Sequence, residues 1–181
     1  MGLFDLFRKP ALNTSRLVIN LTEDGFDVNG THIALPCNID ALKYLFGRAR
    51  ETVHQLNFTN EINYNYTWDK IGLYCYSKGG TIVHALSVRM NGEPDLSYSP
   101  RSLFGGFFTI NGENWFEVMK NGETEWLEDE GFKIPVFKRI NMGRYSVVSE
   151  FTNEDISDGS VNIPDDLKNI EVEYTDGGFA E

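Results

Sequence analysis

The stretch Tyr66–Asn91, YTWDKIGLYCYSKGGTIVHALSVRMN, decides the fold that this sequence predicts. It holds two runs of apolar, aromatic and β-branched residues, Ile71–Tyr76 and Thr81–Met90, which are typical of β-strands. Between them lies Ser77-Lys78-Gly79-Gly80, which has the composition of a turn, so the stretch is expected to form a β-hairpin. Because both runs are apolar at nearly every position, we expect central strands that are covered on more than one side.

The residues before this hairpin predict a small meander followed by a helix. Turn residues separate three strand candidates, which are Arg16–Leu21, Phe26–Val28 and Thr31–Leu35. Ile39–Phe46 carries its apolar residues on one face, and Asn38 before it is a residue type that caps helix N-termini. We expect this helix to end at Gly47 and to cover a sheet.

The remaining segments predict further strands and one polar surface segment. Glu51–Asn65 is polar and rich in Asn, and is expected to wrap the surface. Later strand candidates are Trp115–Met119, Thr124–Leu127, Ile134–Phe137, Arg144–Phe151 and Ile170–Tyr174. Phe26–Gly30 resembles Phe108–Gly112, since each enters an Asn-Gly turn; this indicates either two similar β-rich lobes or chance. The predicted class is α+β, with antiparallel β-meanders covered by one main helix and short helical segments.

Three segments make up the predicted organisation: an N-terminal amphipathic segment at residues 1–10, one α+β domain at 11–175 and a tail at 176–181. Gly2–Arg8, GLFDLFR, is apolar on one side, so it packs on its own domain or contacts a membrane surface through residues 2–8. Neither a signal peptide nor an apolar run of bilayer length is apparent. We therefore expect a cytoplasmic protein without an integral membrane segment.

Charge is distributed unevenly along the chain. The net charge is -11 and the pI about 4.7, which argues against a nucleic-acid partner, because phosphate contacts need clustered Lys and Arg. Residues 91–181 carry 19 acidic against 7 basic residues, whereas residues 1–90 carry 8 against 9. This asymmetry indicates either simple solubility or a surface that attracts a basic partner.

Signatures of catalysis, cofactors or metals are absent from the sequence. The three His and two Cys residues lack the close pairing of structural zinc sites, and no phosphate-binding glycine pattern or nucleophile elbow occurs. Cys37 and Cys75 are expected to be buried free thiols. Trp68 is expected to close the core with its N–H hydrogen-bonded, and Asp69 to cap a turn; ligand contact at Trp68 is the alternative. We expect no enzyme activity, no cofactor and no metal.

The segment Glu113–Glu130, ENWFEVMKNGETEWLEDE, mixes aromatic and acidic residues. Strand alternation would send the aromatic rings inward, whereas an acidic face with exposed rings would suit a basic partner. Together with a second acidic segment, it supplies the candidate partner-binding residues: Glu113, Trp115, Glu117, Glu123, Glu125, Trp126, Glu128, Asp129, Glu130, Glu154, Asp155 and Asp158.

Several segments carry resemblances to known proteins. The opening MGLFDLFRKP, with the small size and acidity, resembles bacterial cytosolic immunity proteins that antagonise interbacterial toxins, including type VI secretion effectors. GFDVNGTHIALPCNIDALKYLFG, YTWDKIGLYCYSK and LFGGFFTINGENW are similar to an uncharacterised bacterial domain family with a Trp-Asp-x-x-Gly segment. The helix followed by a Trp-bearing strand and hairpin also resembles β-lactamase-inhibitor proteins and outer-membrane assembly lipoproteins, although the lipobox cysteine is missing.

The first resemblance implies an immunity protein that binds and neutralises a toxin by steric occlusion, with a contact surface on the toxin that is basic. The alternative is a non-catalytic small-molecule or peptide-binding module that uses the sheet face around Trp68 and Tyr74. A hydrolase would require clustered groups with strongly shifted pKa values in a cleft.

Overall fold

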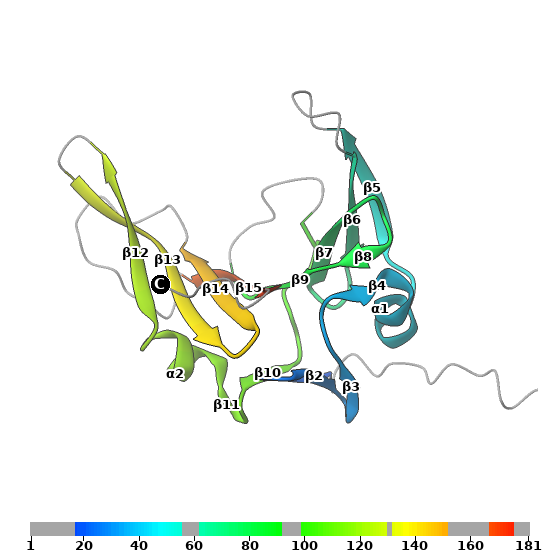
Figure 1. Cartoon of the computed structure of the whole chain (residues 1–181), viewed down its shortest axis with the longest axis horizontal. Helices are drawn as coiled ribbons and strands as arrows, with labels where there is room; N and C mark the ends of the chain where they lie inside the picture. Colours follow the sequence, from blue (N-terminus) through cyan, green and yellow to red (C-terminus); the bar gives the residue numbers. More distant parts are fainter. Residues whose placement is uncertain (1–16, 56–61, 92–98, 130–131, 152–166, 176–181) are drawn as a thin grey trace, which may run out of the picture.

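The computed structural model describes residues 17–55, 62–91, 99–129, 132–151 and 167–175 (Figure 1). A small sheet contains, in spatial order, β11 (Glu113–Asn114), β10 (Phe107–Ile110), β1 (Val18–Thr22), β2 (Gly25–Val28) and β3 (Thr31–Ile33). A large sheet contains β12 (Glu123–Asp129), β13 (Phe132–Met142), β14 (Tyr145–Phe151), β15 (Leu167–Tyr174), β9 (Ala85–Arg89), β7 (Leu73–Lys78), β6 (Ile62–Trp68) and β5 (Arg50–Gln55). A short pair joins β4 (Cys37–Asn38) to β8 (Ile82–Val83).

The expected α+β class is wrong, because the described residues are mostly strand. Their two helices are α1 (Ile39–Phe46) and the five-residue α2 (Trp115–Met119), which cannot cover two sheets. We expected α2 to be a strand, but the Asn114 side chain accepts the Phe116 N–H at 2.9 Å and caps a helical turn. Neither helix is both long and apolar enough for a membrane-spanning segment.

The polar stretch Glu51–Asn65 also departs from the expectation, because it supplies most of β5 and the first half of β6 rather than a surface wrap. An antiparallel strand near a sheet edge keeps one face in water, so polar residues do not prevent pairing there. The two Asn-Gly hairpins do not form separate lobes. Both belong to the small sheet, where β2 and β10 lie on either side of β1.

Several predicted elements are confirmed. The central hairpin is present, since β7 pairs antiparallel with β9 in the middle of the large sheet. The meander of β1, β2 and β3 is present, and α1 spans the expected residues with Asn38 capping its first turn at 2.9 Å. The N-terminal segment at 1–10 and the tail at 176–181 lie outside the described residues.

The core lies between the two sheets and α1. The small sheet contributes Ile19, Leu21, Phe26 and Phe108, and the large sheet contributes Leu73, Leu86, Val88, Val147, Ile170 and Val172. Ile39, Leu42 and Phe46 of α1 close one end. Tyr145 of β14 crosses this core, because its hydroxyl accepts the Leu35 N–H at 3.2 Å. All of these residues form one apolar cluster, so the sheets are packed as one unit.

The chain passes from the large sheet to the small sheet over Gly72, which has φ +71°. A Cβ atom at Gly72 would lie 2.4 Å from the Phe104 main-chain nitrogen, so only glycine permits this crossing. Main-chain hydrogen bonds fix it on both sides, from the Arg89 N–H to the Gly72 carbonyl at 2.8 Å and from the Phe104 N–H to the Arg89 carbonyl at 2.7 Å. Beyond the crossing, Gly106 passes against the Leu17 carbonyl, which aligns β10 parallel to β1.

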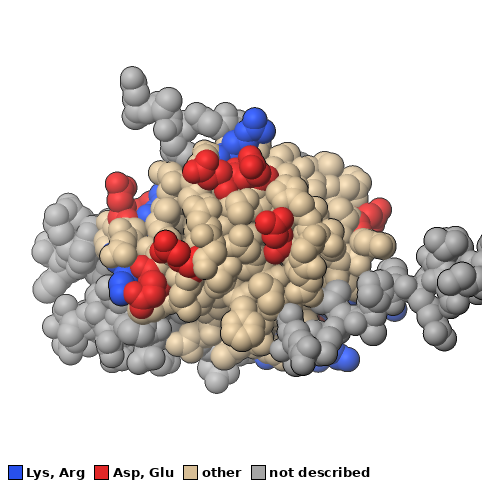
Figure 2. All heavy atoms as spheres, turned by 90° about the horizontal axis from the view of Figure 1, so that it is seen from below, with Lys and Arg blue, Asp and Glu red and all other residues tan. Residues whose placement is uncertain are grey.

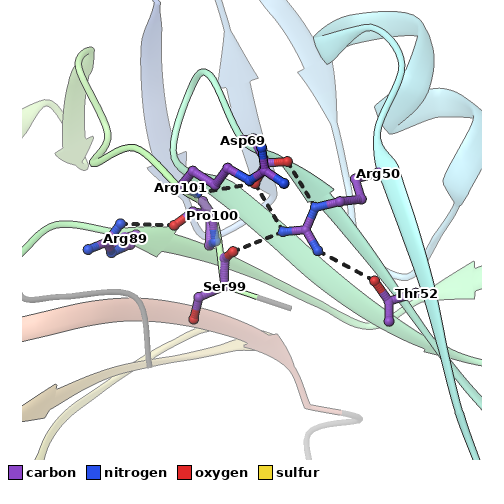
Figure 3. Close-up of polar contacts among 7 residues, drawn as sticks. All are labelled: Arg50, Thr52, Asp69, Arg89, Ser99, Pro100 and Arg101. Atoms are coloured by element: carbon purple, nitrogen blue, oxygen red, sulfur yellow. Dashed lines mark hydrogen bonds and ion pairs between the residues drawn. The ribbon is translucent and has the colours of Figure 1, made fainter. Parts of the chain in front are cut away.

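A polar clamp holds the segment that leads into this crossing (Figure 3). The Arg50 guanidinium donates to both carboxylate oxygens of Asp69, at 2.9 and 3.0 Å, and also to the Ser99 carbonyl at 3.0 Å. Asp69 accepts the Arg101 main-chain N–H at 3.1 Å, and the Arg89 guanidinium donates to the Pro100 carbonyl at 2.8 Å. The clamp therefore ties residues 99–101 to β5, to β9 and to the residue that follows β6.

The Trp-Asp-x-x-Gly segment thus has a structural role at each named position. Trp68 is buried, its indole N–H donates to the Gly47 carbonyl at 2.9 Å, and its ring packs edge-on against Phe46. This confirms the prediction that Trp68 closes the core. Asp69 binds Arg50 and accepts the main-chain N–H of Arg101, so it holds a segment distant in sequence rather than the local turn that was expected, and Gly72 permits the crossing.

Replacing Gly72 with Ala tests the crossing, and Gly79→Ala is a matched control because Gly79 has φ +72° with no atom near an added Cβ. Gly79→Ala should lower the free energy of unfolding by about 1 kcal/mol, the cost of a left-handed alanine. Gly72→Ala should cost at least about 3 kcal/mol, because the main chain at Phe104 must also move. Urea unfolding measures both; equal losses would contradict the steric account.

Asp69→Asn tests the clamp. Hydrogen bonds from Arg50 lower the pKa of Asp69, although partial burial opposes them. Because the pKa of Asp69 is lower in the folded state than in the unfolded state, its ionised carboxylate stabilises the fold. This stabilisation is complete above the unfolded-state pKa, near 4, and is lost as the pH falls through the folded-state pKa. Urea unfolding at pH 7 should show a free energy of unfolding about 2 kcal/mol lower in the variant than in the wild type. This difference should shrink as the pH is lowered toward about 3. A difference in the free energy of unfolding that is independent of pH would show that the charge of the Asp69 carboxylate does not contribute to stability.

Candidate functional site

The outer face of the small sheet carries the candidate site. Strand alternation sends Ile19, Leu21, Phe26 and Phe108 into the core and turns their neighbours outward. The outward residues form two rows across the strands. One row crosses β10, β1, β2 and β3 and consists of Thr109, Asn20, Asp27 and His32. In the other row, Val18 of β1 lies opposite Phe107 of β10.

Phe107 and Val18 are an exposed apolar pair on this face. Phe107 is 68% exposed and Val18 41%, whereas the next residue, Phe108, is 4% exposed. Covering a Phe side chain is worth about 2 kcal/mol, so leaving one open has a cost that a partner could recover. Aromatic residues, Phe included, are enriched at protein interfaces relative to the rest of the surface.

The backbone around the exposed pair is held in place on both sides. Val18 makes two hydrogen bonds with Asn29, each 2.9 Å: its N–H donates to the Asn29 side-chain oxygen, and its carbonyl accepts the Asn29 N–H. The Phe107 N–H donates to the Leu17 carbonyl at 2.8 Å. Asn20 accepts from the Thr109 hydroxyl and from the Gly112 N–H, both at 2.8 Å. This presents the pair on a rigid surface, which lowers the entropy cost of binding.

This part of the chain is anionic. Residues 17–42 and 102–119, which include every strand of the small sheet, contain no Lys or Arg. They carry six acidic residues, which are Glu23, Asp24, Asp27, Asp40, Glu113 and Glu117. Figure 2 shows this side of the molecule with Asp and Glu spread over it and the visible Lys and Arg toward its margins. Such a field attracts cationic partners and repels anionic ones.

Three of the predicted partner-binding residues lie beside this face. Glu113 is exposed on β11, and Glu117 is exposed on α2, where it pairs with Lys120. Trp115 is half-buried and packs edge-on against Phe116, with the ring centroids 5.7 Å apart. In the described part of this segment the acids face water while the aromatic rings pack on the core, as the first alternative expected, although residues 115–119 form a helix rather than a strand.

The other predicted residues do not join them. Glu123 and Glu125 lie on β12 of the large sheet, where Glu125 pairs with Arg139 of β13. β12 also includes Trp126, Glu128 and Asp129, whose side chains are outside the described part of the structure. Glu130, Glu154, Asp155 and Asp158 also lie outside it. The described members of the predicted set are therefore divided between β11 and α2 on one side and β12 of the large sheet on the other.

Sequence reasoning missed Phe107, Val18 and Asp27 as surface residues. Phe107 stands in an apolar run, Phe104–Ile110, where it looks like part of the core. Strand alternation was the available signal, since two consecutive Phe residues in a strand cannot face the same side. Which of the two faces outward depends on the pairing of β10 with β1.

Metal-binding groups and thiols are candidate reactive groups. In the described ranges, no three His, Cys, Asp or Glu residues are grouped to hold a metal ion. Cys37 and Cys75 are free thiols; burial raises the pKa of Cys37 to about 11 and raises that of Cys75 further. Neither thiol is a ready nucleophile at neutral pH, since the reactive form is the thiolate. Trp68 is buried, which removes it as a ligand contact.

The fold and this face define a β-rich domain with an anionic, partly apolar sheet surface. The chain belongs to a family described as a domain of unknown function (DUF7738), whose model matches residues 18–125. The match includes the small sheet, both helices, the Gly72 crossing and the clamp, and it stops within β12. No curated protein and no solved structure matches the chain.

Paired substitutions at the adjacent Phe residues test whether the face is open. Phe107→Ala should change the free energy of unfolding by less than about 0.5 kcal/mol, as for an ordinary surface position. Phe108→Ala should cost about 3–5 kcal/mol, because it opens a cavity in the core. Urea unfolding of both variants provides the measurement. A similar loss for both would mean that another part of the chain covers Phe107.

Proposed function

We propose that this protein binds a basic protein partner on the outer face of the small sheet, and that it serves as an immunity protein for an interbacterial toxin. The observation that carries the binding proposal is an exposed Phe107–Val18 pair on a sheet without Lys or Arg. The resemblance of the sequence to immunity proteins supplies the biological role.

The size of the face indicates how far the contact must extend. Four strands spaced about 4.8 Å apart, each about four residues long, make a surface of roughly 15 by 14 Å. A stable complex covers about 800 Å² on each partner, several times that area. The contact would therefore also include α2 and β11, where Glu113 and Glu117 are exposed. In this way two of the predicted binding residues become part of the proposed interface.

Charge and apolar contact would have separate roles in such a complex. The acidic residues around the face would accelerate capture of a cationic partner, an effect that salt weakens. Phe107 and Val18 would contribute most to the lifetime of the complex, because apolar burial is largely insensitive to moderate salt. Inhibition would be steric, with the rigid sheet occupying the partner's working surface.

The test uses the product of the neighbouring gene as the candidate toxin. Phe107→Ala should raise its dissociation constant roughly tenfold, the equivalent of about 1.4 kcal/mol. Asp27→Asn should mainly slow association, and the effect should shrink as salt is added. Tyr44→Ala is the matched control, because Tyr44 is 66% exposed but lies on α1. Surface plasmon resonance measures both rate constants.

Protection of cells tests the biological role separately. Expression of the neighbouring gene product alone should arrest growth, and co-expression of this protein should restore it, less well with Phe107→Ala than with Tyr44→Ala. Absence of any complex at micromolar concentrations, at both low and moderate salt, would reject this toxin as the partner. A complex without growth protection would retain the binding role and reject immunity.

A further inference from the structure

A hollow of about 230 Å³ opens on the large sheet, on the face turned away from the small sheet. Its lining combines two aromatic rings, one aliphatic side chain, one amide and two carboxylates, from Tyr74, Phe137, Val148, Asn169, Glu150 and Glu171. These residues come from β7, β13, β14 and β15, which lie in one continuous sheet (Figure 1). The core residues Val147, Ile170 and Val172 alternate with them along the strands.

Strand register explains why this hollow forms. One row across the sheet runs from Tyr74 to Ser87, Glu171 and Val148. Ser87 is the smallest member of this row and lies between Tyr74 and Glu171, so the sheet surface is lower there. In the next row Glu150 lies between Asn169 and Phe137. Glu150 and Glu171 are thus diagonal neighbours, roughly 7–8 Å apart.

The carboxylates of the hollow are held by neutral donors. The Ser87 hydroxyl donates to Glu171 at 2.8 Å, and the Asn169 amide donates to Glu150 at 3.0 Å. Burial raises the pKa of Glu171, the Ser87 hydrogen bond opposes this, and the carboxylates of Glu173 and Glu150 raise it further. The described groups that shift the pKa of Glu171 include no cation.

Two arginines extend from the same face, and both have other contacts. Arg139 lies opposite Val148, but its guanidinium binds Glu125 and donates to the Ser146 hydroxyl at 2.6 Å. Arg89 lies opposite Asn169, and its guanidinium donates to the Pro100 carbonyl at 2.8 Å. The negative charge of Glu171 is therefore not paired with an Arg or Lys side chain among the described residues.

The chemistry of the lining selects the kind of ligand. The described residues place no three metal-binding side chains together, and aromatic walls do not coordinate a hydrated metal ion. A ring face beside a carboxylate suits an organic cation, which gains both cation–π and ionic contacts. We propose that this hollow binds an alkylammonium group, with Glu171 and Glu150 holding the charge and Tyr74 and Phe137 flanking the alkyl stem. The proposal is independent of the role of the small sheet.

The test titrates the ¹⁵N-labelled full chain with n-butylammonium and, as the neutral control, 1-butanol. The main-chain amide signals of Tyr74, Ser87 and Glu171 should shift with a dissociation constant on the order of 1–10 mM, as for a five-atom ligand. 1-Butanol should cause no comparable shift. Spermidine and Nα-acetyl-lysine amide then distinguish a free polyamine from a protein lysine side chain, and the tighter ligand identifies the source.

Charge removal provides the decisive comparison. Glu171→Gln keeps the shape and should weaken n-butylammonium binding at least about tenfold, or about 1.4 kcal/mol. Glu150→Gln is a second variant, to be used if Glu171→Gln fails to fold. Glu113→Gln, on the small sheet, is the matched control and should bind n-butylammonium normally. Phe107→Ala should also bind normally, which separates this result from the partner-binding proposal. Three results would each overturn the proposal. They are no amide shifts at 50 mM n-butylammonium (about five times the weakest expected dissociation constant), equal shifts with 1-butanol, and unchanged n-butylammonium affinity in both Gln variants.

Discussion

The close passage of the Phe104 main chain over Gly72 is the contact on which the arrangement of the two sheets depends. An added Cβ would come within 2.4 Å of a main-chain nitrogen there, so no other residue type fits without a shift of the backbone. The clamp of Arg50 and Asp69 holds the preceding residues against the large sheet. Together they direct the chain from β9 to β10, and hence from one sheet to the other.

This passage also determines which surface the molecule presents. Because β10 lies parallel to β1 in a set register, Phe107 is placed opposite Val18 on the outer face while Phe108 enters the core. A shift of one residue would exchange the two rings between core and solvent. The family match ends at residue 125 and so contains this whole arrangement, whereas most of the hollow on the large sheet comes from strands beyond it.

Local signals were sufficient for some elements and misleading for others. The capping Asn38, the one-sided apolar pattern and the closing Gly47 predicted α1 correctly, since all three act within a few residues. The same kind of cap at Asn114 was overlooked because Trp115 and Phe116 favour strands, and a five-residue helix has little periodicity to detect. The polar strands β5 and β6 were missed because Asn and Glu are uncommon in strands, although β6 pairs with its neighbours in sequence, β5 and β7.

The sequence by itself determined the strand-rich hairpins, the main helix, the role of Trp68 in the core and the acidity of the chain. These follow from residue type and short spacings, which operate before the chain has any tertiary contact. Only the tertiary structure decided which acidic residues share a surface, which of two adjacent Phe rings is exposed and where the carboxylates surround a hollow. Strand order and register between distant segments set these features, and no local pattern records that pairing.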